Sequence, residues 1–226
     1  MHITPFLAAL CLLALVGCSG SNTAPEQAAP HKSTAPLSVA CVGDSNTAGY
    51  GAESYTVALA EDLGEGYRVT NYGVSGTTAM ASGSYPYSET SAYHDSLAAA
   101  PDIVVLMFGT NDTASWRGAD VFAREYDALV SDYLALDPQP RLILCTPPAP
   151  HTEETPSTVS FGVQPAAYNA VNSAIRTTAE QHHLSLIDVY TLTSGHPEWF
   201  LDDGIHLAND GAAALADAVA ECILEK

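Results

Sequence analysis

The run Ile103-Val-Val-Leu-Met-Phe108 contains six apolar residues in succession and leaves neither face of a strand polar. Such a strand is buried on both faces, as happens in parallel sheets that helices cover from both sides. Two parallel neighbours cannot be joined by a tight hairpin and need a crossover connection, usually a helix. This run therefore predicts an α/β fold with strands and helices in alternation.

Apolar runs and helical spacing do alternate along the chain. Further strands are predicted at 37–42, 68–72, 142–145 and 184–189, and helices at 55–63, 91–100, 119–136, 165–182 and 208–224. Gly and Pro punctuate these segments, and a stretch rich in Gly, Ser, Thr and Tyr at 74–87 is typical of a long loop. The pattern predicts a three-layer α/β/α sandwich around a five-stranded, mainly parallel sheet.

The first 36 residues differ from the rest. Residues 1–17 contain no Lys, Arg, Asp or Glu and are too short to span a bilayer, which predicts a secretory signal. Its end, Leu15-Val-Gly-Cys18, resembles a bacterial lipobox, which implies lipidation of Cys18, with an ordinary secretory signal as the alternative. Residues 18–36 have almost no large apolar side chain and predict a disordered tether. Residues 37–226 are long enough for one folded domain.

These features predict the location of the protein and its contact with the membrane. We expect it in the bacterial cell envelope, lipid-anchored at the outer membrane or cell surface, and otherwise secreted. The N-terminal lipid is the expected membrane attachment. The sequence leaves the oligomeric state open.

The charge balance restricts the partners. The chain has 7 Lys and Arg against 26 Asp and Glu, a net charge of −19 with His neutral. Phosphate binding needs a basic surface, so nucleic acid is not an expected partner. An acidic field also repels polyanionic substrates, which favours a neutral small-molecule or oligosaccharide ester.

Cysteine and histidine usage gives no sign of a disulfide framework or a metal site. Outside the predicted signal and lipobox, Cys41, Cys145 and Cys222 are an odd number, widely spaced, with two of them in apolar runs. The pair His182-His183 has no third ligand nearby, and adjacent residues point apart on a helix. We expect no metal and no cofactor.

Polar motifs follow four of the predicted strands. They are Gly43-Asp-Ser45, Gly76, Gly109-Thr-Asn111-Asp112 and Asp203-Gly-Ile-His206. Ligands of open α/β sheets bind outside the carboxyl ends of the strands, so we expect all four motifs at one edge. A serine on a strand-to-helix turn, a histidine and an acid three residues before it are the parts of an acyl-transfer site. The sequence therefore predicts an esterase.

The same motifs, with Gly76 inside Asn71-Tyr-Gly-Val-Ser-Gly76, resemble the four sequence blocks of the SGNH hydrolases, also called GDSL esterases. The resemblance extends from about Leu37 to the C-terminus. Asn46 departs from it, since it stands where the name-giving leucine would be. The resemblance implies a flavodoxin-like SGNH hydrolase fold and an acyl-enzyme mechanism.

The resemblance also implies a role for each motif residue. Ser45 matches the nucleophile, His206 the general base and Asp203 the acid that orients it. The backbone N–H groups of Ser45 and Gly76 and the side-chain amide of Asn111 match the oxyanion donors.

Several neighbouring residues compete for these roles or support them. Asp202 is the local competitor of Asp203. Gly73 is the local competitor of Gly76, and we assign Gly73 to a turn. We expect structural roles for Gly109 and for Asp112, which would bond loop amides. Asp44 is expected to hold its turn, with a catalytic role left open.

Within the resemblance, the sequence is most similar to the carbohydrate O-acetylesterase branch. This implies removal of acetyl groups from a neutral glycan such as acetylated xylan. Trp116 follows the Asn111 motif, and Tyr85 and Tyr87 lie on the loop after Gly76, so these three are candidate substrate contacts, with ordinary packing as the alternative. A lysophospholipase or thioesterase is the alternative enzyme. Metal-assisted hydrolysis through Asp203 and His206, or a catalytically inactive glycan-binding surface protein, are the remaining alternatives.

Overall fold

The computed structural model describes residues 35–152 and 161–225, and its central element is a five-stranded sheet. The strands are β1 (Leu37–Gly43), β2 (Tyr67–Asn71), β3 (Ile103–Met107), β4 (Arg141–Cys145) and β5 (Ser185–Ile187). All four pairings are parallel, in the order β2-β1-β3-β4-β5, which is the flavodoxin-like order. The predicted signal, Cys18 and the tether as far as residue 34 lie outside the described residues.

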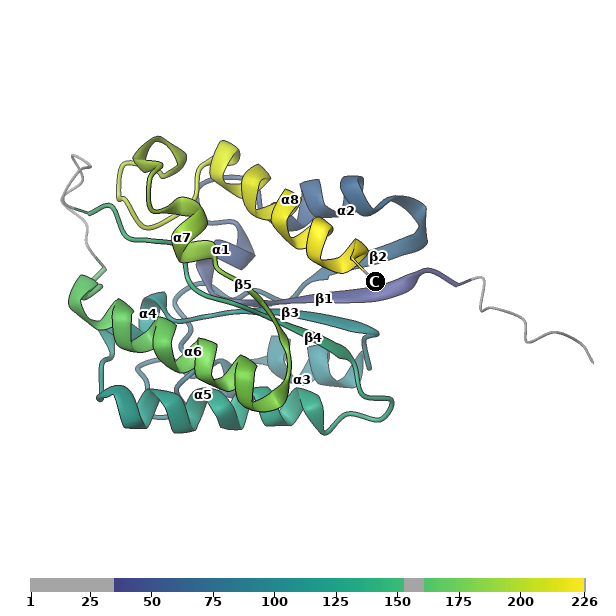
Figure 1. Ribbon diagram of the computed structural model, residues 1–226, viewed down its shortest axis with the longest axis horizontal. Coiled ribbons are helices and arrows are strands. Elements are labelled where there is room, and N and C mark those ends of the chain that lie inside the picture. The colour runs from purple at the N-terminus through teal and green to yellow at the C-terminus, as the bar shows by residue number, and fades with distance from the viewer. Residues whose placement is uncertain (1–34, 153–160, 226) are drawn as a thin grey trace, which may run out of the picture. The chain divides into compact units, whose positions relative to one another are not determined.

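Helices cover both faces of this sheet. They are α1 (Ser45–Ala48), α2 (Tyr55–Leu63), α3 (Ser91–Ala98), α4 (Thr110–Ala114), α5 (Ala119–Leu134), α6 (Tyr168–His182), α7 (Val189–Thr193) and α8 (Asn209–Leu224). Single 3-10 turns are η1 (Gly64–Gly66), η2 (Tyr87–Glu89), η3 (Pro165–Ala167) and η4 (Pro197–Trp199). Helices α2 and α8 pack on one face, and α3, α5 and α6 on the other (Figure 1). The predicted three-layer α/β/α sandwich is confirmed.

Two separate cores explain why β3 is apolar throughout. Alternate β3 residues (Ile103, Val105, Met107) pack in the core under α2 and α8, and the residues between them (Val104, Leu106) pack in the core under α5 and α6. Each is at most 5% exposed. Burial of one such side chain stabilises the fold by about 1.5–3 kcal/mol. A polar residue anywhere in β3 would therefore disturb one core or the other.

Side-chain caps fix where α2 and α3 begin. The Ser54 hydroxyl accepts a hydrogen bond from the Thr56 backbone N–H at 3.2 Å, and the Thr90 hydroxyl accepts one from Tyr93 at 3.2 Å. Such caps satisfy backbone donors that have no partner within the helix.

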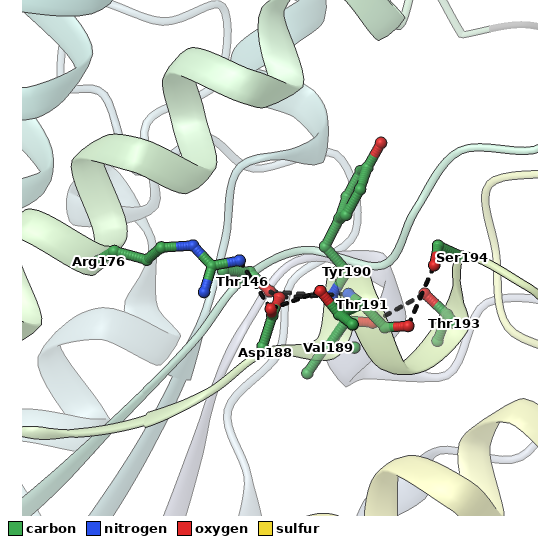
Figure 2. A network of polar contacts seen from close by, with 8 residues as sticks. All are labelled: Thr146, Arg176, Asp188, Val189, Tyr190, Thr191, Thr193 and Ser194. Atoms are coloured by element: carbon green, nitrogen blue, oxygen red, sulfur yellow. Dashed lines mark hydrogen bonds and ion pairs between the residues drawn. The ribbon is translucent and has the colours of Figure 1, made fainter.

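Asp188 lies between β5 and α7 and is the N-cap of α7. The sequence had predicted that the strand continues to residue 189, so the strand ends two residues earlier than expected. The Asp188 side chain N-caps α7 through the Thr191 backbone N–H, accepts from the Thr146 hydroxyl at 3.2 Å and pairs with Arg176 of α6 at 2.7 Å (Figure 2). Burial opposes its charge, but the hydrogen bonds from Thr191 and Arg176 outweigh this and lower the pKa of Asp188. The carboxylate thus fastens α6, α7 and the segment after β4 to one another.

In the part of the chain that the structure describes, no helix is long and apolar enough to span a membrane. Over the same residues, no three His, Cys, Asp or Glu side chains are grouped so as to hold a metal ion.

Candidate active site

The turn that follows β1 carries Ser45. Asp44 caps α1, and its carboxylate accepts a hydrogen bond from the Asn46 backbone N–H at 3.0 Å. The chain can pass close to β3 here because residue 43 is glycine: a Cβ would lie 2.6 Å from the Met107 carbonyl oxygen. Ser45 therefore stands at the N-terminus of a short helix, at the carboxyl end of the sheet, with its side chain 4% exposed.

The loop before α8 brings Asp203 and His206 to this serine. One Asp203 oxygen accepts from the backbone N–H groups of Ile205 and His206, at 2.9 and 3.0 Å. Its other oxygen lies 2.7 Å from His206 Nδ1, and His206 Nε2 lies 2.9 Å from Ser45 Oγ. Three polar side chains from opposite ends of the chain are thus joined in one row.

The charge of Asp203 decides where the protons of this row lie. Burial alone would raise the pKa of Asp203, but the hydrogen bonds from His206 and Ile205 outweigh it and lower this pKa below its ordinary value. An ionised carboxylate can only accept, so His206 Nδ1 donates to it. Nε2 is then left to accept from the Ser45 hydroxyl, which is the arrangement in which imidazole can act as a base.

Asn46 holds the two motifs in register. Its side-chain oxygen accepts from the Leu207 backbone N–H at 3.0 Å, and its amide donates to the Ile205 carbonyl at 3.3 Å. These two bonds bracket His206 from both sides. The residue that departs from the family's leucine thus links the turn after β1 to the histidine loop.

The loop after β2 places Gly76 beside Ser45. Asn71 ties this loop to the serine turn, because its oxygen accepts from the Gly73 backbone N–H and its amide donates to the Thr47 carbonyl, both at 2.8 Å. Gly76 has φ +83°, a left-handed conformation that glycine adopts without strain. Of the two candidate glycines, Gly76 lines the cavity beside Ser45 and Gly73 is not among the lining residues.

Helix α4 presents Asn111 to the same place. The Asn111 amide donates one hydrogen bond to the Thr77 carbonyl at 3.0 Å, which orients the group and leaves its second N–H for the cavity. The buried Asp112 carboxylate accepts from the backbone N–H groups of Ala79 and Met80, at 3.1 and 2.8 Å. Asp112 therefore bonds loop amides, as the sequence predicted.

A cavity of about 220 Å³ opens above these groups. Its described lining consists of Ser45, Tyr50, Ser75, Gly76, Asn111, Phe161, Val163, Ile205 and His206. Ser75, Gly76 and Asn111 are polar members of this lining, and Tyr50, Phe161, Val163 and Ile205 are apolar ones. No Lys or Arg occurs among these residues. Within the described residues, no protein group accepts a hydrogen bond from the backbone N–H of Ser45 or of Gly76.

The aromatic side chains at this cavity differ from those that the sequence nominated. Tyr87 is fully buried and donates to the Tyr72 carbonyl at 2.8 Å, so the prediction that it contacts substrate is wrong. Trp116 is partly buried, packs against Phe122 at the edge of the core under α5 and is not among the described lining residues. Tyr85 is 46% exposed near Gly76 but outside the lining.

The aromatic side chains that line the cavity are Tyr50 and Phe161. Neither of them was selected in the sequence analysis. They are 45% and 46% exposed, and their rings meet edge to face with centroids 6.0 Å apart. Neither belongs to a motif, and only the fold brings them together. The sole sequence signal was that Tyr50 lies five residues after Ser45.

Asp44 gives the stability of the domain a pH dependence of its own. Burial raises its pKa to about 7, against the hydrogen bond from Asn46 and with help from the charge of Asp112. The folded chain then holds this proton more tightly than the unfolded chain between about pH 4 and pH 7, so the free energy of unfolding falls as pH rises through that interval. Asparagine carries no such proton and keeps an oxygen for Asn46.

We therefore expect Asp44→Asn to gain stability relative to the wild type by about 1–3 kcal/mol between pH 5 and pH 8. Urea denaturation at both pH values measures this difference. Asp112, whose pKa burial raises to about 6, is present in both proteins, so both pH profiles contain a contribution from it. Parallel pH profiles for the two proteins would show that Asp44 is ionised throughout.

Comparison with known proteins assigns the chain to a family. Residues 41–214 match the GDSL-like Lipase/Acylhydrolase family, and this range contains all four motifs. The chain belongs to this family. By that membership the domain is a carboxylic ester hydrolase, and the matched range includes Ser45, Asp203 and His206.

A curated relative is described as an acetylxylan esterase from Xylanibacter ruminicola. It is 30% identical to this chain in an alignment of 217 positions that covers 83% of this chain. The match spans 43% of the relative's own length, so that protein contains much that has no counterpart here.

Solved structures of similar fold include two described as esterases. One is the inhibitor-bound aryl esterase of M. smegmatis, with a TM-score of 0.66 and 20% identity over 83% of this chain and 98% of that one. Another is Est24, a carbohydrate acetylesterase from Sinorhizobium meliloti, with a TM-score of 0.65 and 22% identity over the same shares. At these identities the likeness establishes the fold.

Proposed function

We propose that this domain is a serine esterase that removes short acyl groups, acetyl above all, from a carbohydrate through an acyl-enzyme. One observation carries the proposal. Ser45 Oγ, the His206 imidazole and the Asp203 carboxylate form a row of contacts at 2.9 and 2.7 Å that ends at the cavity. The serine hydroxyl is a weak nucleophile until an adjacent base takes its proton, and His206 Nε2 is placed to do so.

In the first half of the reaction, Ser45 Oγ bonds to the carbonyl carbon of the ester while its proton passes to His206 Nε2. The carbonyl π pair moves to oxygen as the oxyanion. When the oxyanion reforms the double bond, the bond to the alcohol oxygen breaks and that oxygen takes the proton from Nε2. Water then repeats the sequence on the acyl-enzyme, which releases the acid and restores Ser45.

The oxyanion is held by three donors in this proposal. The backbone N–H groups of Ser45 and Gly76 have no protein acceptor among the described residues. Asn111 lines the same cavity, and its amide has a second N–H beside the one that it donates to Thr77. Donors already fixed in position need no reorganisation as charge develops, and each contributes about 10²- to 10³-fold in rate. Bonds to Thr77 and to Asn71 keep the donor loop in place.

A neutral carbohydrate ester suits the electrostatics of the molecule. The net charge of −19 and the absence of Lys and Arg from the described lining favour an uncharged substrate. The relative named for acetylxylan supports acetylated xylan as the first glycan to test. Tyr50 and Phe161, which are nearly half exposed and line the cavity, supply apolar aromatic surface for contact with a sugar.

A longer acyl chain is the second candidate, because four apolar residues line the cavity: Tyr50, Phe161, Val163 and Ile205. Activity on esters of different acyl-chain length distinguishes the acetylesterase from the long-chain acyl hydrolase. On p-nitrophenyl esters of two to twelve carbons we expect kcat/KM to be highest for acetate and to fall at least tenfold by octanoate, since a cavity of about 220 Å³ limits the acyl group.

Acetate release from acetylated xylan oligosaccharides, measured enzymatically, completes this test. Deacetylated xylan of the same length is the matched control and should yield no acetate. A maximum at eight carbons or more, together with no acetate from any acetylated glycan, would replace the proposal by the lysophospholipase or thioesterase alternative.

A further inference from the structure

The ring of Tyr50 lies on the imidazole of His206. Their centroids are 4.1 Å apart and their planes are inclined by 30°. The Tyr50 backbone N–H donates to the Ser45 carbonyl at 3.1 Å, so the turn that carries the serine also carries this ring. Tyr50 is 45% exposed, whereas the histidine under it is 5% exposed. The ring therefore covers one face of the imidazole and separates it from solvent.

The face of an aromatic ring is the negative part of its quadrupole, and it attracts a cation within about 6 Å of its centroid. Tyr50 meets this condition for a histidine that becomes charged. No Lys or Arg lies among the described lining residues to compete for the ring or to repel the charge. The Asp203 carboxylate, 2.7 Å from Nδ1, occupies the edge of the imidazole and leaves its face to the tyrosine.

We propose that Tyr50 is a positioning residue that stabilises the imidazolium of His206 through the face of its ring. The inference rests on the proposed function, because His206 becomes an imidazolium only while it holds the proton of Ser45 or of the attacking water. Since this cation exists in the tetrahedral intermediates and not in the bound ester, the contact strengthens during the reaction. Such an interaction raises kcat and leaves KM nearly unchanged.

Phe161 packs against both rings of the Tyr50–His206 pair. Its ring is nearly perpendicular to both Tyr50 and His206, with interplanar angles of 83° and 89°. Edge-to-face packing of this kind is favourable between aromatic rings and limits how far Tyr50 can swing away from the imidazole. Phe161 is thus in contact with the stacked pair without being stacked on it.

The test varies the electron density of the ring at nearly constant shape. Tyr50 is replaced by phenylalanine and by mono-, di- and trifluorophenylalanine. For each variant, kcat and KM are measured on p-nitrophenyl acetate. Tyr50→Phe should stay within about twofold of the wild type, because the face is retained. Each added fluorine should lower kcat further, and Tyr50→Leu should lose about 3- to 30-fold in kcat.

A matched control uses the same fluorinated residues at Tyr67, a half-buried tyrosine at the start of β2, the opposite end of the strand from the site. Substitution there should leave kcat unchanged along the series. Thermal melts of all variants identify any loss that comes from unfolding, and the fluorinated series keeps the test valid if Tyr50→Leu is unstable.

Two results would overturn the inference while the esterase stands. The first is a kcat that does not change with fluorine number in an active enzyme. The second is a loss confined to KM and dependent on the alcohol, which would make Tyr50 a platform for the leaving group. If the wild type showed no esterase activity that is lost on mutation of Ser45, both the proposed function and this inference would be overturned.

Discussion

Replacing Ser45 with alanine is expected to lower kcat/KM on p-nitrophenyl acetate by about 10⁴- to 10⁶-fold. The hydroxyl oxygen forms the covalent bond to the acyl carbon, and no other group in the row with His206 and Asp203 can take its place. The fold should not suffer, because Ser45 contributes its side chain only to the bond with His206. Steady-state kinetics measure the loss, and a thermal melt checks the fold.

The control for this variant is Ser131→Ala, the same chemical change at an exposed position on α5 that does not line the cavity. It should keep full activity. Mass spectrometry of the quenched wild type should find the acyl group on the peptide that contains Ser45. Undiminished activity of Ser45→Ala would exclude the serine mechanism, and metal-assisted hydrolysis through Asp203 and His206 would be tested next with chelators.

The layers of the fold could be predicted because burial on both faces leaves a direct mark in the sequence. Every residue of β3 is apolar because alternate residues of that strand pack in the two cores on opposite faces of the sheet. The short helices α1, α4 and α7 were not predicted. They have four or five residues each, too few for a helical period to show. Local side-chain caps mark the starts of two of them, Asp44 at α1 and Asp188 at α7.

The polar part of the site could be predicted because parallel strands deliver their carboxyl ends to one edge. Ser45, Asn111 and the histidine loop each follow a strand, so their meeting required only the order of the strands. The apolar part follows no such rule. Tyr50 and Phe161 meet across 111 residues of sequence. Tyr87 is buried in the core instead, and Trp116 packs partly buried against that core. Side-chain packing decides whether an aromatic residue lines the cavity or is buried in the core. This packing produces no periodic pattern in the sequence from which it could be predicted.

Asp203→Asn is expected to lower kcat/KM by about 10³- to 10⁴-fold while leaving Ser45 and His206 in contact. Asparagine can turn its amide nitrogen toward His206 Nδ1, which must then accept a hydrogen bond instead of donating one. The imidazole proton moves to Nε2, and Nε2 can no longer take the proton of Ser45. In the opposite orientation the amide nitrogen faces the backbone N–H groups of Ile205 and His206, where two donors repel each other.

Asp202→Asn is the matched control, because the neighbouring carboxylate is exposed and makes no contact with His206. It should retain the activity of the wild type. The two variants also decide between the two acids that the sequence offered for one role. A large loss in Asp202→Asn with an active Asp203→Asn would assign the role to Asp202, and equal, small losses in both would mean that His206 needs no carboxylate to hold its tautomer.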